Sequence, residues 1–190
     1  MIQLVMSIIF VTSKPSPSTK YRYALVKTCW GSLAFVCRDS LVCRLFFGFS
    51  KQQHLSAEIK NHFPTAYLNN NLLKGLQRDL ADYFHGRYVE FNCRADLSWA
   101  GDFTNRVLRR CSRLKPAETM SYKELAKQIG SPRAARAAGN ALSKNRIPLI
   151  VPCHRIITSN GLPGGFSAPG GTNLKKRLIK HEAEMTHSKS

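Results

Sequence analysis

Acidic residues are scarce in this chain of 190 residues, which has 11 Asp and Glu against 29 Lys and Arg and a formal charge of +18. The excess is uneven, because residues 1–100 carry 12 basic and 6 acidic groups whereas residues 101–190 carry 17 and 5. Hydrophobic residues make up 43% of the chain, which excludes a disordered tail and suffices for one medium globular domain or two small ones. We expect a polyanionic partner, nucleic acid first, bound mainly by the second half.

The sequence also has little that suggests a membrane or secreted protein. The apolar stretch at residues 1–11 is shorter than the roughly 20 residues of a membrane-spanning helix. No basic residue precedes it and no small-x-small cleavage site follows it, which argues against a secretory signal. Residues 12–20 are rich in Ser, Pro and Lys, as flexible linkers are. We therefore expect residues 1–20 to be a disordered extension or a wrongly assigned start, outside the fold, and we expect no membrane partner.

Cysteine pairs of the CxxC type are absent, and the six cysteines follow no regular framework. This excludes a disulfide-rich scaffold and favours reduced thiols in an intracellular protein, cytoplasmic or, in a eukaryote, nuclear.

The hydrophobic pattern divides the chain near residue 100. Short apolar runs between residues 21 and 49 predict two or three strands of a small antiparallel sheet. Helical spacing follows over residues 54–63 and, more strongly, over residues 72–86, and residues 88–102 resemble a strand and a loop. We expect an α/β (α+β) protein with an N-terminal domain over 21–100, a helical domain over 101–185 and a tail at 186–190.

The second half predicts a helix-turn-helix. After a helix over residues 103–114, Ser121 and Glu124 form a capping box that opens a helix through Ile129, and Gly130 ends it. Ser131 and Pro132 have the preferences of a following helix start. On that second helix one face is apolar and another is basic, with Ala135, Ala138 and Leu142 on the first and Arg133, Arg136, Asn140 and Lys144 on the second. A basic second helix is typical of DNA binding, although a solvated helix surface has the same pattern.

The run at residues 145–157 brings a cysteine next to a histidine. Two prolines keep this run extended, and an imidazole beside Cys153 favours the reactive thiolate. Glu182 shares a helix face with Leu174 and Leu178, so a buried partner is expected for it, and His154 is the natural one. The pattern thus predicts a Cys153–His154–Glu182 relay. A buried structural cysteine and a solvated Glu182 remain open alternatives.

Residues 103–182 resemble the O6-alkylguanine-DNA alkyltransferases, also called methylated-DNA–protein-cysteine methyltransferases. The resemblance rests on SYKELA, PRAARAAGNAL, NxIPLIVPCHR and the GFS…K…HE series in the family's order, whereas residues 21–100 match only in general layout. It implies a ribonuclease H-like N-terminal domain and a C-terminal domain with the helix-turn-helix. It also implies irreversible transfer of an alkyl group from O6-alkylguanine, and possibly O4-alkylthymine, in double-stranded DNA to Cys153, with base flipping and one lesion repaired per molecule.

The resemblance assigns roles residue by residue. Tyr122 corresponds to the proton donor of the leaving guanine, Asn145 to the brace of the active-site loop, and His154 with Glu182 to the water-linked relay. Arg136 corresponds to the arginine that replaces the flipped base, and Leu142 to an apolar residue that presses on the minor groove. Further DNA contacts are expected from Arg133, Ala135, Lys144 and Arg155. The substrate pocket is expected to comprise Val151, Ile156, Phe166, Ser167 and Lys175.

The chain departs from the family pattern in ways that leave the substrate range open. Position 166 is Phe rather than Tyr, and the segment 167–171 is two residues longer than the shortest family form. Arg146 also replaces a common proline, a departure that does not touch the chemistry. Some relatives hold a structural zinc, for which the candidate ligands here are Cys29, Cys37, Cys43, His54, His62 and His85. Their spacing matches no recognised zinc pattern, so we expect no metal and no cofactor. We also expect the protein to be a monomer.

Two other functions compete with alkyl transfer. A helix-turn-helix protein that binds lesions or regulates transcription would keep the DNA affinity and its salt dependence without a reactive Cys153. A cysteine hydrolase would need an oxyanion site, which nothing in the sequence indicates.

Overall fold

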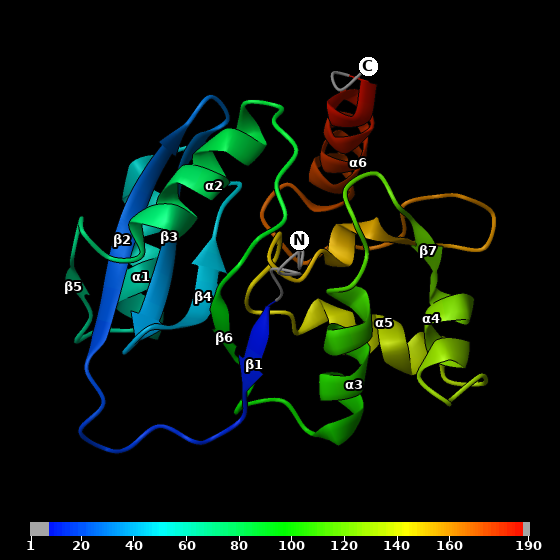
Figure 1. Ribbon diagram of the computed structural model, residues 1–190, viewed down its shortest axis with the longest axis horizontal. Coiled ribbons are helices and arrows are strands. Elements are labelled where there is room, and N and C mark those ends of the chain that lie inside the picture. The colour runs from blue at the N-terminus through cyan, green and yellow to red at the C-terminus, as the bar shows by residue number, and fades with distance from the viewer. Residues whose placement is uncertain (1–7, 188–190) are drawn as a thin grey trace, which may run out of the picture.

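The computed structural model describes residues 8–187, and its first half is a mixed six-stranded sheet flanked by helices (Figure 1). The strands are β1 (Ile9–Val11), β2 (Tyr21–Thr28), β3 (Gly31–Arg38), β4 (Leu41–Phe46), β5 (Tyr67–Leu68) and β6 (Arg94–Asp96). Their order in the sheet is β1-β6-β4-β3-β2-β5. The predicted antiparallel unit is confirmed as β2-β3-β4, and β5 and β6 join it in parallel.

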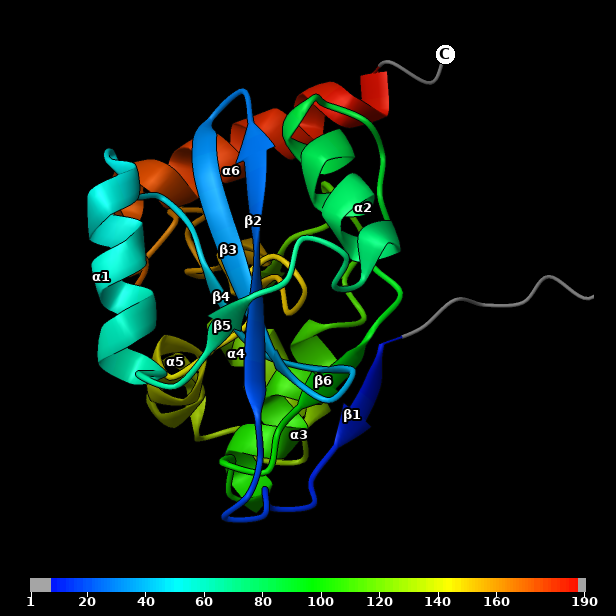
Figure 2. The ribbon, with the colours of Figure 1, turned by 90° about the vertical axis from the view of Figure 1, so that its left-hand side faces the viewer.

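Helices α1 (Gln52–His62) and α2 (Lys74–Phe84) cover opposite faces of this sheet (Figure 2). Strand β3 serves both faces, because its side chains alternate between them. Phe35 packs into the main core with α2, and Val36 packs with Leu55 and Ile59 of α1. Burial on both faces explains why β3 has a nearly continuous apolar sequence rather than an alternating one.

Part of the segment expected to lie outside the fold belongs to the sheet. Ile9–Val11 form β1, which pairs in parallel with β6. The following residues are held by Arg38, whose guanidinium forms an ion pair with Asp96 at 2.8 Å and donates to the carbonyl of Ser13 at 2.5 Å. Short apolar β1 thus covers the free edge of β6, a role that the composition of residues 12–20 obscured. Residues 1–7 and 188–190, which include most of the expected tail, lie outside the described residues.

The second half is a helical domain. Its elements are α3 (Asp102–Cys111), β7 (Met120–Ser121), α4 (Tyr122–Gln128), α5 (Ala135–Ser143), the 3₁₀ helix η1 (Cys153–Arg155), β8 (Ile156–Ile157) and α6 (Gly171–His187). The predicted capping box is present at the start of α4, since the Glu124 N–H donates to Ser121 Oγ at 3.1 Å and Glu124 Oε2 accepts from the Ser121 N–H at 2.8 Å. The mixed sheet with helices and the helical second half confirm the predicted fold class.

The second helix of the helix-turn-helix starts later than predicted. Ser131, Pro132 and Arg133 form a turn in which the Ser131 carbonyl accepts the Ala134 N–H at 2.9 Å, and α5 begins at Ala135. Ser131 therefore does not cap α5, and Arg133 precedes the helix. The apolar face predicted for α5 is confirmed by the burial of Ala138 and Leu142.

Helix α6 contacts the first half at two places, the turn between β2 and β3 and the end of α2. The Arg177 guanidinium lies 3.6 Å from the centre of the Trp30 ring, and His181 Nε2 lies 2.7 Å from the Tyr83 carbonyl oxygen. One buried core runs through both halves, from Leu33 of β3 to Leu178 of α6. None of the helices within residues 8–187 is long and apolar enough to cross a membrane.

Candidate active site

The loop between α5 and η1 is braced by Asn145. The Asn145 side-chain amide donates to the Val151 carbonyl at 2.8 Å, and its oxygen accepts the Ile147 N–H at 3.1 Å. Leu149 within this loop has a φ of 70°, a left-handed conformation that a leucine adopts only when its surroundings impose it. The loop is thereby fixed and holds η1, with Cys153 at its start, in one position.

The thiol of Cys153 is nearly buried, with 5% of the residue exposed. Burial raises its pKa, while the hydrogen bond that Asn145 Nδ2 donates to Sγ at 3.2 Å and the charge of Lys175 act in the opposite direction. Because the net effect favours the neutral thiol, Cys153 needs a base to become a nucleophile.

His154 follows Cys153 in η1 and is fully buried. Its Nε2 lies 2.8 Å from Glu182 Oε1, which fixes the ring, whereas its Nδ1 is buried without a hydrogen-bond partner among the described residues. Burial lowers the pKa of His154, and the negative charge of Glu182 opposes that shift. The imidazole is therefore neutral near pH 7, with Nδ1 as the nitrogen able to accept a proton.

Glu182 is the centre of a buried polar network. Besides His154, it accepts hydrogen bonds from Tyr83 Oη at 2.8 Å, from the Ala117 N–H at 3.2 Å and from Arg155 Nε and Nη2 at 2.9 and 2.8 Å. Burial alone would raise the pKa of Glu182, but His154 and Arg155 hold it well below its usual range. Glu182 is thus a permanent carboxylate, and the alternative of a solvated helix end is wrong.

Arg155 takes a role other than the DNA contact expected of it. Its side chain is buried against Glu182 and also donates to the Leu114 carbonyl. A guanidinium that is committed to a buried carboxylate is not available to a phosphate, so the structure corrects this expectation.

Tyr122 is the first residue of α4 and lines the same pocket as Cys153. Its Oη accepts a hydrogen bond from Lys175 Nζ at 3.3 Å, and Lys175 also donates to the Ile156 carbonyl at 2.5 Å. Burial raises the pKa of Tyr122 and lowers that of Lys175 to about 8. Gly164, with a φ of 63°, lies so close that a Cβ there would approach Tyr122 Oη to 3.1 Å. The phenol is therefore protonated and fixed in place.

Tyr122 and Cys153 face one pocket with a volume of about 370 Å³. It is lined by Tyr122, Gly139, Asn140, Leu142, Ser143, Cys153, Gly165, Phe166 and Ser167. Of the residues predicted for the substrate pocket, Phe166 and Ser167 line it directly. Val151, Ile156 and Lys175 are buried behind it, where Val151 and Ile156 offer their carbonyls to Asn145 and Lys175.

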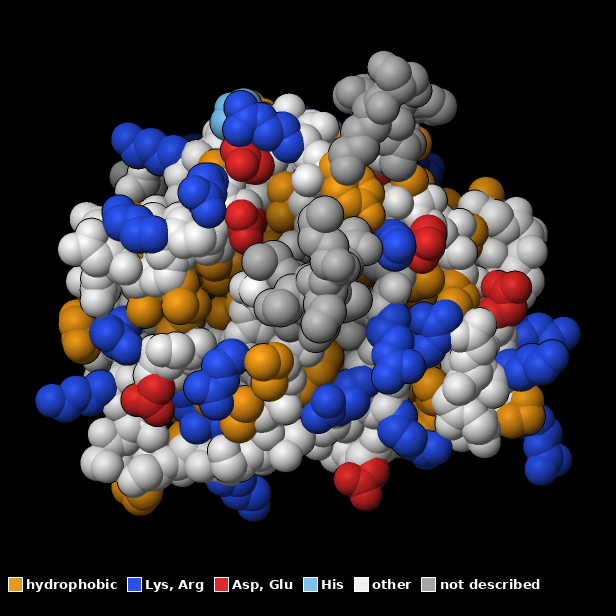
Figure 3. All heavy atoms as spheres, in the orientation of Figure 1, with side chains coloured by type: hydrophobic (Ala, Val, Ile, Leu, Met, Phe, Trp, Pro, Cys, Tyr) orange, Lys and Arg blue, Asp and Glu red, His pale blue; other side chains and the backbone are white. Residues whose placement is uncertain are grey.

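The residues expected to contact DNA are only partly on the surface. Arg133, Arg136 and Lys144 are exposed and Ala135 is half-buried. Leu142 is instead 5% exposed and forms pocket wall, because its face of α5 packs on the core. In Figure 3 Lys and Arg side chains are spread over both halves of the face shown and greatly outnumber Asp and Glu, in keeping with the net charge of +18.

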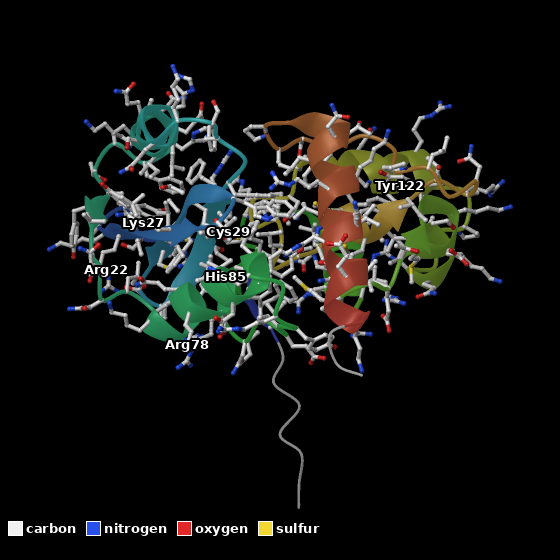
Figure 4. The ribbon with its side chains drawn as sticks, turned by 90° about the horizontal axis from the view of Figure 1, so that it is seen from above. Arg22, Lys27, Cys29, Arg78, His85 and Tyr122 are labelled. Atoms are coloured by element: carbon white, nitrogen blue, oxygen red, sulfur yellow. The ribbon has the colours of Figure 1, made fainter. Side chains whose placement is uncertain are left out.

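The six candidate zinc ligands do not gather at one place. Cys37 and Cys43 are buried in the sheet, His54 and His62 belong to α1, and Cys29 and His85 lie near the end of α2 on the other face (Figure 4). Within residues 8–187 no group of three or more His, Cys, Asp or Glu side chains is arranged to hold a metal ion.

Sequence reasoning did not identify Tyr83 and Ala117, which complete the ligation of Glu182. Tyr83 follows Leu76 and Leu80 on the apolar face of α2, so its burial was predictable but its partner 99 positions away was not. The Ala117 N–H is a backbone group in a left-handed turn and leaves no trace in the side-chain pattern.

Comparison with known proteins relates both halves to one group. Residues 102–184 match the family model for the 6-O-methylguanine DNA methyltransferase, DNA binding domain. Methylated-DNA–protein-cysteine methyltransferase of Metallosphaera sedula is 31% identical over 86% of this chain and 94% of its own length, and that of Sulfolobus acidocaldarius is 41% identical over 60% and 70%. The crystal structure of Mycobacterium tuberculosis OGT in complex with DNA superposes with a TM-score of 0.72 at 32% identity, covering 86% and 94% of the two chains.

Proposed function

The chain belongs to the methylated-DNA–protein-cysteine methyltransferases, which repair O6-methylguanine in DNA, and we propose that its methyl acceptor is Cys153. The observation that carries this assignment is the position of Cys153 in a pocket wall. The residue after it, His154, is hydrogen-bonded through Nε2 to buried Glu182. Another buried cysteine, Cys111, does not line this pocket, and burial holds the pKa of its thiol well above the usual range.

The first step is the activation of the thiol. His154 Nδ1 takes the proton of Cys153 through a bridging water, and Glu182 stabilises the imidazolium that forms. The thiolate then attacks the methyl carbon, so that the S–C bond forms as the bond between carbon and guanine O6 breaks. Because the thioether is stable, the protein is consumed in the reaction.

The departing guanine would carry a negative charge, and Tyr122 removes it by donating its phenolic proton. The raised pKa of Tyr122 keeps that proton in place beforehand. Lys175, at 3.3 Å, stabilises the phenolate left behind, which regains a proton from solvent as the imidazolium releases one. The protons therefore balance, and the products are S-methylcysteine and neutral guanine.

The substrate is a double-stranded DNA bound by a monomer along α5, with the damaged base turned out of the stack into the pocket. Arg136 and Lys144 are exposed on and just after α5, and Arg133 precedes it, which suits contacts to the backbone and to the gap left by the base. Phe166 stacks over the base and Ser167 contacts its oxygen. We expect the protein in the cytoplasm or, in a eukaryote, in the nucleus, an expectation that its free cysteines support.

The test of this assignment is a single mass measurement. Purified protein is mixed with an equimolar duplex carrying one O6-methylguanine and digested with trypsin, and the peptide 147–155 is weighed, since it contains Cys153 as its single cysteine. The expected result is one added methyl group in stoichiometric yield. An unmodified peptide from a protein that binds the duplex would support the non-catalytic lesion-binding alternative instead.

Arg136 provides a prediction that separates flipping from binding. We expect Arg136→Ala to slow methyl transfer at saturating DNA by about tenfold or more. Turning a base out of the stack costs a few kcal/mol, and without a side chain to fill the gap the base returns to the stack more readily. Overall duplex affinity should fall only about twofold, because Arg136 is one of several cations that attract the DNA backbone. The measurement compares single-turnover rates with dissociation constants, and Lys123→Ala, another exposed cation of the helix-turn-helix, is the control. Equal losses in rate and affinity would contradict the finger role.

A further inference from the structure

A second cavity, of about 630 Å³, lies between the sheet domain and the active-site loop. It shares Ser143, Cys153, Phe166 and Ser167 with the smaller pocket, so the two cavities meet at the thiol. The larger one therefore continues the active site toward the N-terminal half, for which the proposed reaction uses no residue other than Tyr83.

Two arginines from the two halves line this cavity. Arg44 comes from β4 and its guanidinium lies 5.2 Å from the centre of the Phe46 ring, while that of Arg146 lies 4.6 Å from the centre of the Trp99 ring. Stacking on aromatic faces orients both groups and leaves their N–H donors open. Within the described part of the chain, neither guanidinium has a hydrogen bond or an ion pair with a protein group.

The charge in the cavity is positive overall. Burial lowers the pKa of Arg44, the positive charge of Arg146 lowers it further, and Glu58 opposes both effects. Glu58 is the one acidic residue of the lining, and it also lies 3.4 Å from His62 Nδ1. Lys144 adds a third cation. Two guanidiniums held near each other without partners are suited to an anion whose several oxygens accept from both.

We propose that Arg44 and Arg146 bind a phosphate of the DNA backbone, so that the sheet domain contributes to DNA binding. The inference rests on the proposed function, in which DNA lies along α5. Lys144, the residue after α5, lines the same cavity and makes it continuous with that surface. This phosphate site needs Arg146, and the family pattern commonly has proline at that position.

The experiment measures duplex affinity as a function of NaCl concentration for the double variant Arg44→Ala/Arg146→Ala. All proteins carry Cys153→Ser so that the complex does not react. Loss of this phosphate contact should reduce the magnitude of the negative slope of log K against log[salt] by roughly 0.9. Affinity at low salt should fall by roughly tenfold. Arg78→Ala on α2, across the sheet from the cavity, is the matched control and should leave the slope unchanged (Figure 4).

A slope equal to that of the parent protein, or to that of Arg78→Ala, would overturn the proposal. Arg146→Ala alone, at an exposed position, gives the same test with a smaller change if the double variant does not fold. Inorganic phosphate, followed by ³¹P line width, separates a free anion from DNA, since binding of phosphate with an unchanged DNA slope also rejects the proposal. Methyl transfer by the unmodified protein is scored separately, so that failure of the phosphate site is distinguishable from failure of the proposed reaction.

Discussion

Replacement of Cys153 by serine is expected to abolish methyl transfer and to leave DNA binding intact. A serine hydroxyl keeps the shape of the site but ionises far less readily than a thiol, so His154 can no longer generate a strong nucleophile. We expect a loss of more than about a thousandfold in transfer rate, the range seen when a nucleophile is removed from an intact relay. Because Cys153 is nearly buried, its replacement leaves the exposed α5 surface unchanged, and duplex affinity should stay within about twofold.

The measurement uses a duplex with a radioactive O6-methyl group and counts label retained on the protein. Cys29→Ser is the matched control, since Cys29 is an exposed free thiol of the sheet domain and should have no effect on transfer. Label on the Cys153→Ser protein at the parent rate would show that another residue is the acceptor and would end the mechanism proposed here. Loss of binding together with loss of transfer would instead indicate that the substitution disturbs the loop held by Asn145.

The relay was predictable because each of its members carries a local signal. Cys153 and His154 are adjacent in a run that prolines keep extended. Glu182 follows Leu174 and Leu178 at four-residue spacing and so shares their helix face. The hydrogen bond of 2.8 Å between His154 and Glu182 confirms the pairing of these two. The capping box was predictable for the same reason, since both of its partners lie within four residues.

Predictions failed where a distant partner decides the outcome. Arg155 sits in a basic half-chain and looked like a DNA contact, but the buried carboxylate of Glu182 claims its guanidinium. The minor-groove role of Leu142 stays a prediction, but its burial against the core and its place in the pocket wall were not apparent from the sequence. The β1 strand was obscured by the linker after it, because three residues pairing in parallel with β6, more than 80 positions away, have no local signature. Helical periodicity tells which residues are inside, and tertiary contacts tell what they meet there.

The second large effect is expected at Glu182, which positions His154 and neutralises Arg155. Glu182→Gln keeps the size of the side chain but removes the charge and turns an NH₂ group toward donors that need an acceptor. The buried Arg155 then has no counter-charge, and loss of one partner of a buried ion pair costs about 3–5 kcal/mol. Transfer should also slow, because the imidazolium formed at His154 loses its stabilising carboxylate. Glu184→Gln, on the exposed side of the same helix, should change stability by less than about 1 kcal/mol.

The pH dependence of stability gives this prediction its sign. The folded-state pKa of Glu182 is depressed, so its contribution is present above the unfolded value of about 4.3 and is lost as pH falls from there toward the folded pKa. The folded-state pKa of His154 is also lowered, so stability begins to fall below the unfolded value of about 6.5. Both groups bind more protons in the unfolded chain and therefore weaken the fold in acid.

The comparison of the two proteins across pH tests the network itself. Urea unfolding between pH 7 and pH 3 should show the unmodified protein losing stability below about pH 6.5 and more steeply below about pH 4.3. The free-energy gap to Glu182→Gln should narrow below about pH 4.3, because the unfolded chain of the unmodified protein gains a proton at Glu182 there, whereas Gln gains none in either state. A gap that stays constant down to pH 3 would show that the cost of the substitution comes from packing rather than from the charge of Glu182. Rescue of transfer by Glu182→Asp, with a carboxylate on a shorter stem, would then distinguish positioning of His154 from a purely structural role.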